Sequence, residues 1–244
     1  MQLPLKMPGL PAYRLRVSTR AKRASISVCP LDGIVLTVPK RFDQRKLPTL
    51  LQEWQPWIER QLIKLEAQRS ERPDNGTGAL PDVIDLPALA HSWQVEYQAR
   101  PTATVRLHET ARGLSLSGKT GDLLLTSRAL QRWLARQARR ALEPMTRQLA
   151  DQHGFSFRRL GIRGQRTRWG SCSSSGTISL NYHLMFLQPE LVRCVVLHEL
   201  CHTRWMNHGQ RFHALLARLE PDYAALDRRI HAGWQRIPGW AWRR

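Results

Sequence analysis

Apolar and polar residues alternate in several short stretches between Tyr13 and Pro39, namely YRLRVS, ASISVCP and GIVLTVP. A two-residue period is typical of half-buried β-strands, and Asp32-Gly33 supplies a hairpin turn before the last stretch. These residues therefore predict antiparallel strands. From Phe42 to Arg69 the apolar residues recur at helical spacing, which predicts a helix that Pro56 kinks or restarts.

The pattern changes after residues 71–82, whose Pro, Gly, Asn and Asp residues make this segment the clearest loop in the chain. Beyond it, SWQVEYQA, ATVRLHE and GLSLSG predict further strands, which end near Leu125. Ser127 is the predicted N-cap of a long helix that bends at Pro144 and ends by Gly154. The sequence shows no internal repeat.

The composition is that of a folded protein with a sizeable core. Hydrophobic residues make up 42% of the 244 residues and nine are tryptophan, which is too much apolar surface for a disordered polyelectrolyte. The N-terminal stretch is interrupted by prolines and lacks the apolar run of a secretory signal, and no apolar run approaches the ~20 residues that cross a bilayer. The four cysteines form no CxxC pair. We therefore expect a cytoplasmic protein that has no membrane span.

The chain is strongly basic, with a net charge of +19 from 38 Lys and Arg against 19 Asp and Glu. Eleven arginines and only two acidic residues lie between Ser127 and Gly176. Anionic partners concentrate at such a surface, so non-specific nucleic acid is a candidate partner for the arginines between residues 128 and 168. The alternative is that these arginines only keep a helix face solvated.

The stretch HELCHTRWMNH, residues 198–208, contains three histidines and a glutamate. Four residues of α-helix turn through about 400°, so His198 and His202 lie on one face, one turn apart, and can share a metal ion. Glu199 lies about 100° around the helix, where it can hold an attacking water without binding the metal. The apolar stretch that starts at Pro189 predicts a buried helix, on which unpartnered histidines would be costly.

The third metal ligand is less directly specified. On an unbroken helix His208 would point away from the pair, but Asn207 and Gly209 readily end helices and would let His208 fold back to the ion. The interval equals that of the pattern HExxHxxGxxH, although Trp205 stands at its glycine position. Two other residues stay open as ligands, His213 and Glu220.

Two blocks, RTRWGSCSSSGTISLNYHL at residues 166–184 and HELCHTRWMNHGQRF at residues 198–212, resemble the YgjP-like zinc metallopeptidases, relatives of the SprT-like proteases. The resemblance implies an α+β zincin domain, a zinc ion bound by His198, His202 and His208, and Glu199 as catalytic base. Together with the strand and helix pattern, it predicts a β-rich N-terminal region with one helical segment, residues 1–125, followed by a zincin-like catalytic domain, residues 126–244.

The block RWGSC followed by GTISLN also predicts a turn that leads into a strand. Zincin architecture places an edge strand beside the active-site helix, where a substrate backbone could pair with it. Arg168, Trp169 and Ser171 either line that cleft or only anchor the strand. Three residues are candidates for stabilising an oxyanion, namely Tyr182, His183 and Tyr223.

These features favour a zinc-dependent metallopeptidase that acts on a protein or peptide substrate. Three histidines would leave one zinc position open, and Glu199 would accept a proton from the attacking water. Two alternatives stay open. One is hydrolysis of a phosphoanhydride, which the many arginines would suit. The other is a basic nucleic-acid-associated protein with a degenerate site.

Overall fold

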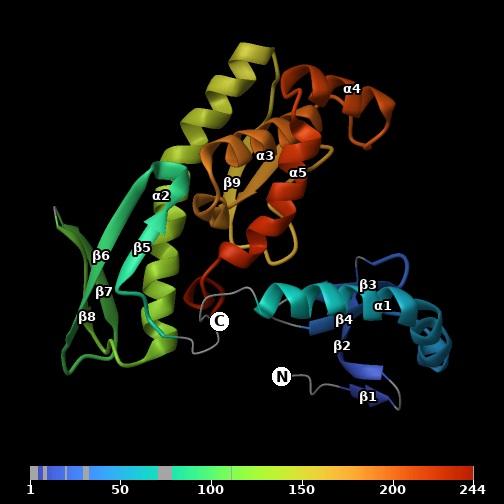
Figure 1. Cartoon of the computed structure of the whole chain (residues 1–244), viewed down its shortest axis with the longest axis horizontal. Helices are drawn as coiled ribbons and strands as arrows, with labels where there is room; N and C mark the ends of the chain where they lie inside the picture. The colour runs from blue at the N-terminus through green and yellow to red at the C-terminus, as the bar shows by residue number, and fades with distance from the viewer. Residues whose placement is uncertain are drawn as a thin grey trace. The chain divides into compact units, whose positions relative to one another are not determined.

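The alternating stretches near the N-terminus form one sheet in the computed structural model (Figure 1). The sheet has the order β1-β2-β4-β3 and consists of β1 (Leu5–Met7), β2 (Leu10–Ser18), β3 (Ser25–Cys29) and β4 (Gly33–Pro39). β3 and β4 pair antiparallel, as predicted. β2 pairs with β4 in parallel, so the expectation of antiparallel strands is wrong for this pair. Alternation shows which residues share a face and does not distinguish the two pairings.

Helix α1 (Leu47–Ser70) packs on this sheet and follows a 3-10 turn at Gln44–Lys46. The helix continues through Pro56. Its buried residues Leu47, Leu51 and Ile58 share a hydrophobic core with the sheet residues Tyr13, Ile34, Leu36 and Val38.

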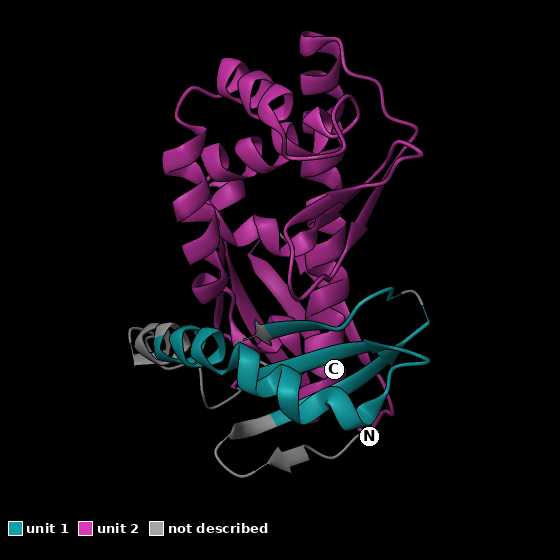
Figure 2. Ribbon diagram, turned by 90° about the vertical axis from the view of Figure 1, so that its right-hand side faces the viewer, with its two compact units in different colours: residues 1–73 teal, residues 74–244 magenta. Residues whose placement is uncertain are grey.

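The structure describes residues 5–7, 10–19, 21–29, 33–70, 79–110 and 112–243. The chain divides into two units, residues 1–73 and 74–244, which have different colours in Figure 2. The predicted turn residue Asp32 and most of the predicted loop, residues 71–78, lie outside the described residues. None of the described helices is both long and apolar enough to cross a membrane.

The second unit begins with another four-stranded sheet that a long helix covers (Figure 1). Its order is β5-β6-β8-β7, with strands β5 (Val83–Leu86), β6 (His91–Ala99), β7 (Val105–Thr110) and β8 (Gly113–Gly118). Helix α2 (Leu123–His153) shares a hydrophobic core with this sheet. The predicted boundary between residues 125 and 126 therefore does not coincide with the division into units.

Helix α2 starts at a different residue from the predicted one and ends where predicted. Asp122 caps the first turn, because its Oδ1 accepts hydrogen bonds from the amides of Leu124 and Leu125, each at 3.1 Å. Ser127, the predicted cap, is instead buried inside the helix. The helix continues through Pro144 and ends as predicted at Gly154, which has a positive φ of 63°.

The two units repeat one topology. In each, the first two strands pair antiparallel, the second and fourth pair parallel, the third and fourth pair antiparallel, and a long helix follows. The registers also correspond, since the fully buried Leu36 and Leu116 occupy equivalent positions in β4 and β8. The repeat is one of topology and not of sequence. β2 and β6 read LPAYRLRVS and HSWQVEYQA, so residue identity does not reveal the repeat.

The remainder of the second unit carries the histidine motif, and its elements complete the predicted α+β fold. A three-stranded sheet in the order β10-β11-β9 is formed by β9 (Arg159–Arg163), β10 (Gly170–Cys172) and β11 (Thr177–Asn181). Three helices follow, α3 (Pro189–Cys201), α4 (Gln210–Leu219) and α5 (Tyr223–Ala232). Short 3-10 helices lie at Pro87–Leu89, Tyr182–Phe186, Gly233–Arg236 and Gly239–Trp242.

Candidate metal centre

The HExxH residues lie at the C-terminal end of α3. Pro189 occupies the first turn, where its missing amide hydrogen costs nothing, and most of the following side chains are buried. The helix ends at Cys201, with His202 as its C-cap. It therefore ends before Asn207 and Gly209, the residues that were expected to end it. The chain still folds back as predicted, and it returns His208 to the end of α3.

The three histidines converge through the same ring atom. Nε2 of His198 lies 3.2 Å from Nε2 of His202 and 3.1 Å from Nε2 of His208. The possible ligand atoms of all three lie within 4.8 Å of one another. Two nitrogens bound to a tetrahedral zinc ion at 2.0–2.1 Å would be about 3.3 Å apart. The distances from His198 to both other histidines therefore fit ligands of one ion, and all three residues could hold it together.

Contacts around the cluster hold the imidazoles in this arrangement. His202 Nδ1 lies 3.1 Å from the carbonyl oxygen of Trp205, so an Nδ1–H donor there leaves Nε2 unprotonated and facing the cluster. The fully buried ring of Phe212, on α4, lies 4.7 to 4.9 Å from all three imidazoles, between ring centroids. Burial lowers the pKa of His198 to about 4 and also lowers that of His202. Both imidazoles are thus neutral near pH 7, which is the form that binds metals.

Glu199 is buried beside the cluster and faces the edge strand β10. Burial raises the pKa of its carboxyl group to about 8, against the opposing effect of the Arg168 charge. Its Oε2 atom has no hydrogen-bond partner among the described residues. A Cβ atom at Gly170 would lie 2.5 Å from Oε1 of Glu199, so β10 can approach the carboxylate this closely because residue 170 is glycine. Sequence analysis missed Gly170, although it lies in the RWGSC block.

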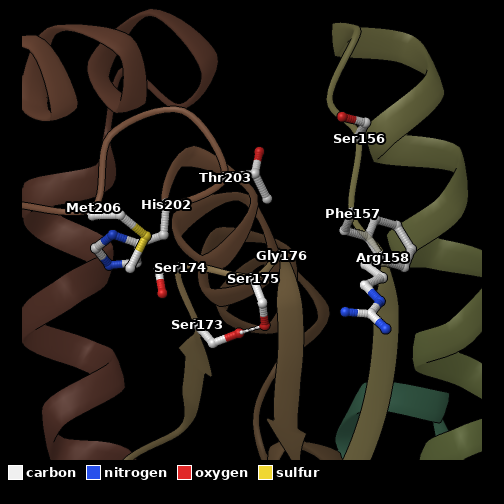
Figure 3. A pocket seen from close by; sticks show the side chains of 10 residues that line it. All are labelled: Ser156, Phe157, Arg158, Ser173, Ser174, Ser175, Gly176, His202, Thr203 and Met206. Atoms are coloured by element: carbon white, nitrogen blue, oxygen red, sulfur yellow. Dashed lines mark hydrogen bonds between the residues drawn. The ribbon is translucent and has the colours of Figure 1, made fainter.

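Two cavities adjoin the histidine cluster. The first, of about 430 Å³, contains His198, Glu199 and His208, and its walls are largely apolar: Trp169, Val195, Phe212, Leu216, Ile230 and Trp234. The second, of about 470 Å³, is lined by His202 and by mainly polar residues (Figure 3). Figure 3 shows it between the turn at Ser173–Gly176, the His202–Met206 segment and the segment that carries Arg158. β10 runs from one cavity toward the other. Gly170, at its start, lines the first cavity, and Ser173, directly after its end, lines the second.

The other two candidate ligands do not join the cluster. Glu220 forms an ion pair with Arg193. Nδ1 of His213 lies 3.3 Å from the hydroxyl of Tyr223, and its ring centroid is 6.3 Å from that of His208. Cys201 is fully buried and lines neither of the two cavities beside the cluster.

The residues expected near a substrate cleft are divided between the cavity and the scaffold. Trp169 has both roles, because it lines the first cavity while its Nε1 donates to the carbonyl of Ile230 at 3.1 Å. Arg168 is exposed and lines the same cavity, whereas Ser171 lies in β10 and lines neither cavity. The strand from Thr177, β11, is the central strand of the sheet, and the edge strand that contacts α3 is β10.

Of the three candidates for stabilising an oxyanion, Tyr223 lines the first cavity together with Glu199. His183 is almost fully buried, and its Nε2 lies 3.1 Å from the carbonyl of Ala241. Tyr182 packs against Gly164, where a Cβ atom would collide with the phenol ring. These contacts make His183 and Tyr182 parts of the scaffold and leave Tyr223 as the candidate beside the cluster.

A family model described as "YgjP-like, metallopeptidase domain" matches residues 22–232, which span both units. Among solved structures, the chain is similar to the metallopeptidase zymogen abylysin of Pyrococcus abyssi. The identity is 22%, the alignment covers 39% of this chain and 97% of that chain, and the TM-score is 0.36. A search of curated proteins found no match.

Proposed function

The chain belongs to the YgjP-like metallopeptidase family, and we propose that it is a zinc-dependent hydrolase that cleaves peptide bonds. The observation that carries the proposal is the convergence of three Nε2 atoms beside a buried carboxylate that has an unpartnered oxygen. His198, His202 and His208 would be the metal ligands. An all-imidazole set of three, with room for a fourth ligand, suits zinc.

A bound zinc ion would supply Lewis acidity, which makes a water molecule more acidic and polarises a carbonyl. The chain supplies the proton transfers. The positive charge of a bound ion would offset the effect of burial on the pKa of Glu199 and favour its ionised form. Glu199 then accepts a proton from the attacking water as the new C–O bond forms, and donates it to the departing amine nitrogen as the C–N bond breaks. Its unpartnered Oε2 is available for this transfer, and Gly170 limits the positions that the carboxylate can take.

The surroundings favour a peptide as substrate. β10 is an edge strand, and an extended peptide can pair with such an edge through main-chain hydrogen bonds. The apolar cavity that contains Glu199 would accept a large apolar side chain. The second cavity, with Arg158 and four serines, would accept a polar or acidic side chain. We therefore expect cleavage next to large apolar residues.

The test combines elemental analysis with hydrolysis of casein and of nucleoside triphosphates, for the wild type and Glu199→Gln. We expect about one zinc per chain in both proteins, and loss of casein hydrolysis by at least about 100-fold in the variant, because an amide cannot accept the proton. Hydrolysis of triphosphates but not casein, lost in the variant, would replace the peptidase with a phosphoanhydride hydrolase. Absence of turnover on both substrates would indicate a degenerate site.

A further inference from the structure

A third cavity in the second unit, of about 280 Å³, lies between β7 and α2 and is strongly basic. β7, one of the two edge strands of its sheet, contributes Arg106 and His108, and α2 contributes Arg132 and Arg136. The remaining lining residues are small or apolar: Val105, Leu107 and Ala129. These seven residues, which we call the arginine groove, line neither of the two cavities beside the histidine cluster.

The arginines of the groove lack counter-charges. Within the described part of the chain, no hydrogen bond or ion pair engages the side chain of Arg106, Arg132 or Arg136, and all three residues are exposed. Other arginines of α2 are paired: Arg139 and Arg147 with Glu143, and Arg140 with Glu109. Three guanidinium groups around one concave surface repel one another, and a bound anion would relieve that repulsion.

The charges along α2 form a row. Arg128, Arg132, Arg136 and Arg140 recur at intervals of four residues, which corresponds to steps of about 6 Å along the helix. A row of this kind complements a chain of regularly spaced anions better than a single small one. The guanidinium group also suits phosphate, because its planar set of donors can bind two phosphate oxygens at once.

The groove is not a consequence of the repeated topology. The register of β3 on β4 corresponds to that of β7 on β8, and it places Ser25 and Ser27 where β7 has Arg106 and His108. The corresponding edge strand of the first unit therefore has no basic residue at these two positions. The basic character of β7 is specific to the second unit.

We propose that the arginine groove binds the phosphodiester backbone of nucleic acid, with Arg106, Arg132 and Arg136 each contacting phosphate. The lining residues include no Phe, Tyr, Trp, Asn or Gln, so the groove offers neither base stacking on one of those large rings nor an amide to read base edges. Binding is therefore insensitive to sequence. The groove and the histidine cluster are separate sites, and either can be tested without the other.

The experiment measures binding of full-length protein to fluorescein-labelled duplex and single-stranded DNA by anisotropy, over a range of salt concentrations. Arg132→Gln/Arg136→Gln is compared with Arg139→Gln/Arg147→Gln, which removes the same charge from paired arginines of the same helix. We expect the groove variant to bind at least about tenfold more weakly at 50 mM salt, and its log-log salt slope on duplex to be shallower by about 1.8, at roughly 0.9 per lost contact. The control variant should remain within about twofold of the wild type.

The proposal is overturned by no wild-type binding at about 50 mM salt, by equal weakening in both variants, or by unchanged affinity in the groove variant. Inorganic phosphate and ATP serve as competitors. If either displaces duplex at a concentration equal to that of the DNA phosphates, the groove binds small anions and the assignment to nucleic acid is wrong. Casein hydrolysis and zinc content should be unchanged in both variants, so failure here is distinguishable from failure of the proposed peptidase.

Discussion

At the scale of single residues, Gly170 fixes the space available to the Glu199 carboxylate. In Gly170→Ala the new Cβ would lie 2.5 Å from Oε1, so either Glu199 or β10 must shift. We expect casein hydrolysis to fall by about 100-fold, because a displacement of about 1 Å can have an effect of this size. Zinc content should stay at the wild-type level.

Gly161→Ala in β9 is the matched control, since its Cβ would meet no atom closer than 3.8 Å. Similar losses in both variants would contradict the role of Gly170.

The third ligand is a second question at this scale. We expect His208→Ala to weaken zinc binding by at least about 100-fold, as measured by competition with a chromophoric chelator, because it removes one of the three converging nitrogens. His213→Ala and Glu220→Ala should change it by only a few fold, since His213 contacts Tyr223 and Glu220 pairs with Arg193. A larger effect at His213 or Glu220 than at His208 would reassign the ligand.

The sequence predicted only part of this site. The four-residue spacing placed His198 and His202 on one helix face, and their Nε2 atoms do meet. The helix-ending residues Asn207 and Gly209 favoured His208 as third ligand, with His213 and Glu220 left open as alternatives, and the resemblance to a family implied His208 as well. Neither Gly170 nor Phe212 received a role, because each acts through a contact between elements distant in sequence: β10 with α3, and α4 with the imidazoles. Local spacing carries no signal for such contacts.

At the scale of elements, Asn181 positions the segment that leads into β10. It is fully buried at the end of β11, and its Nδ2 donates to the carbonyls of Gln165 and Arg168, at 2.7 and 3.0 Å. In Asn181→Ala both carbonyls lose this donor, so we expect the free energy of unfolding in urea to fall by about 1–3 kcal/mol. Casein hydrolysis should also fall.

Ser92→Ala removes an exposed hydrogen bond to Asp85 and serves as the control, with an expected loss under about 0.5 kcal/mol. Equal losses would show that Asn181 has no special role.

Elements were predicted more reliably than the way they pair. Periodicity identified α1 and α2, whose apolar residues share a buried face, and a nearly continuous apolar stretch identified α3. It misplaced the start of α2, where the Asp122 side chain accepts two amide hydrogen bonds that hydrophobic spacing does not report. It also missed the parallel pairing of β2 with β4, because the alternation in a strand is the same in either direction.

At the scale of the whole molecule, the two units combine one topology with different chemistry. Each contains four strands followed by a long helix, but all residues of the histidine cluster and of the arginine groove belong to residues 74–244. The family match nevertheless includes most of the first unit, from residue 22. The two units share the positions of their buried residues and differ in their exposed ones. Ser25 and Arg106, for example, occupy equivalent positions in the register but have different side chains.

This division predicts how metal removal affects the two units. A ligand that binds the folded state stabilises it by about 2.7 kcal/mol when its free concentration is 100 times its dissociation constant. The three proposed ligands join the end of α3 to the segment before α4. We therefore expect a chelator to increase hydrogen exchange at backbone amides of residues 198–212, by about tenfold or more, and to leave exchange in β2 and β4 within about twofold. Exchange followed by mass spectrometry, with and without chelator, measures both regions in one sample.

His202→Ala should show the faster exchange without chelator and no further change when chelator is added. Protection of residues 198–212 that is independent of both the chelator and His202 would mean that no metal holds this segment, and the histidine cluster would then not be a metal site.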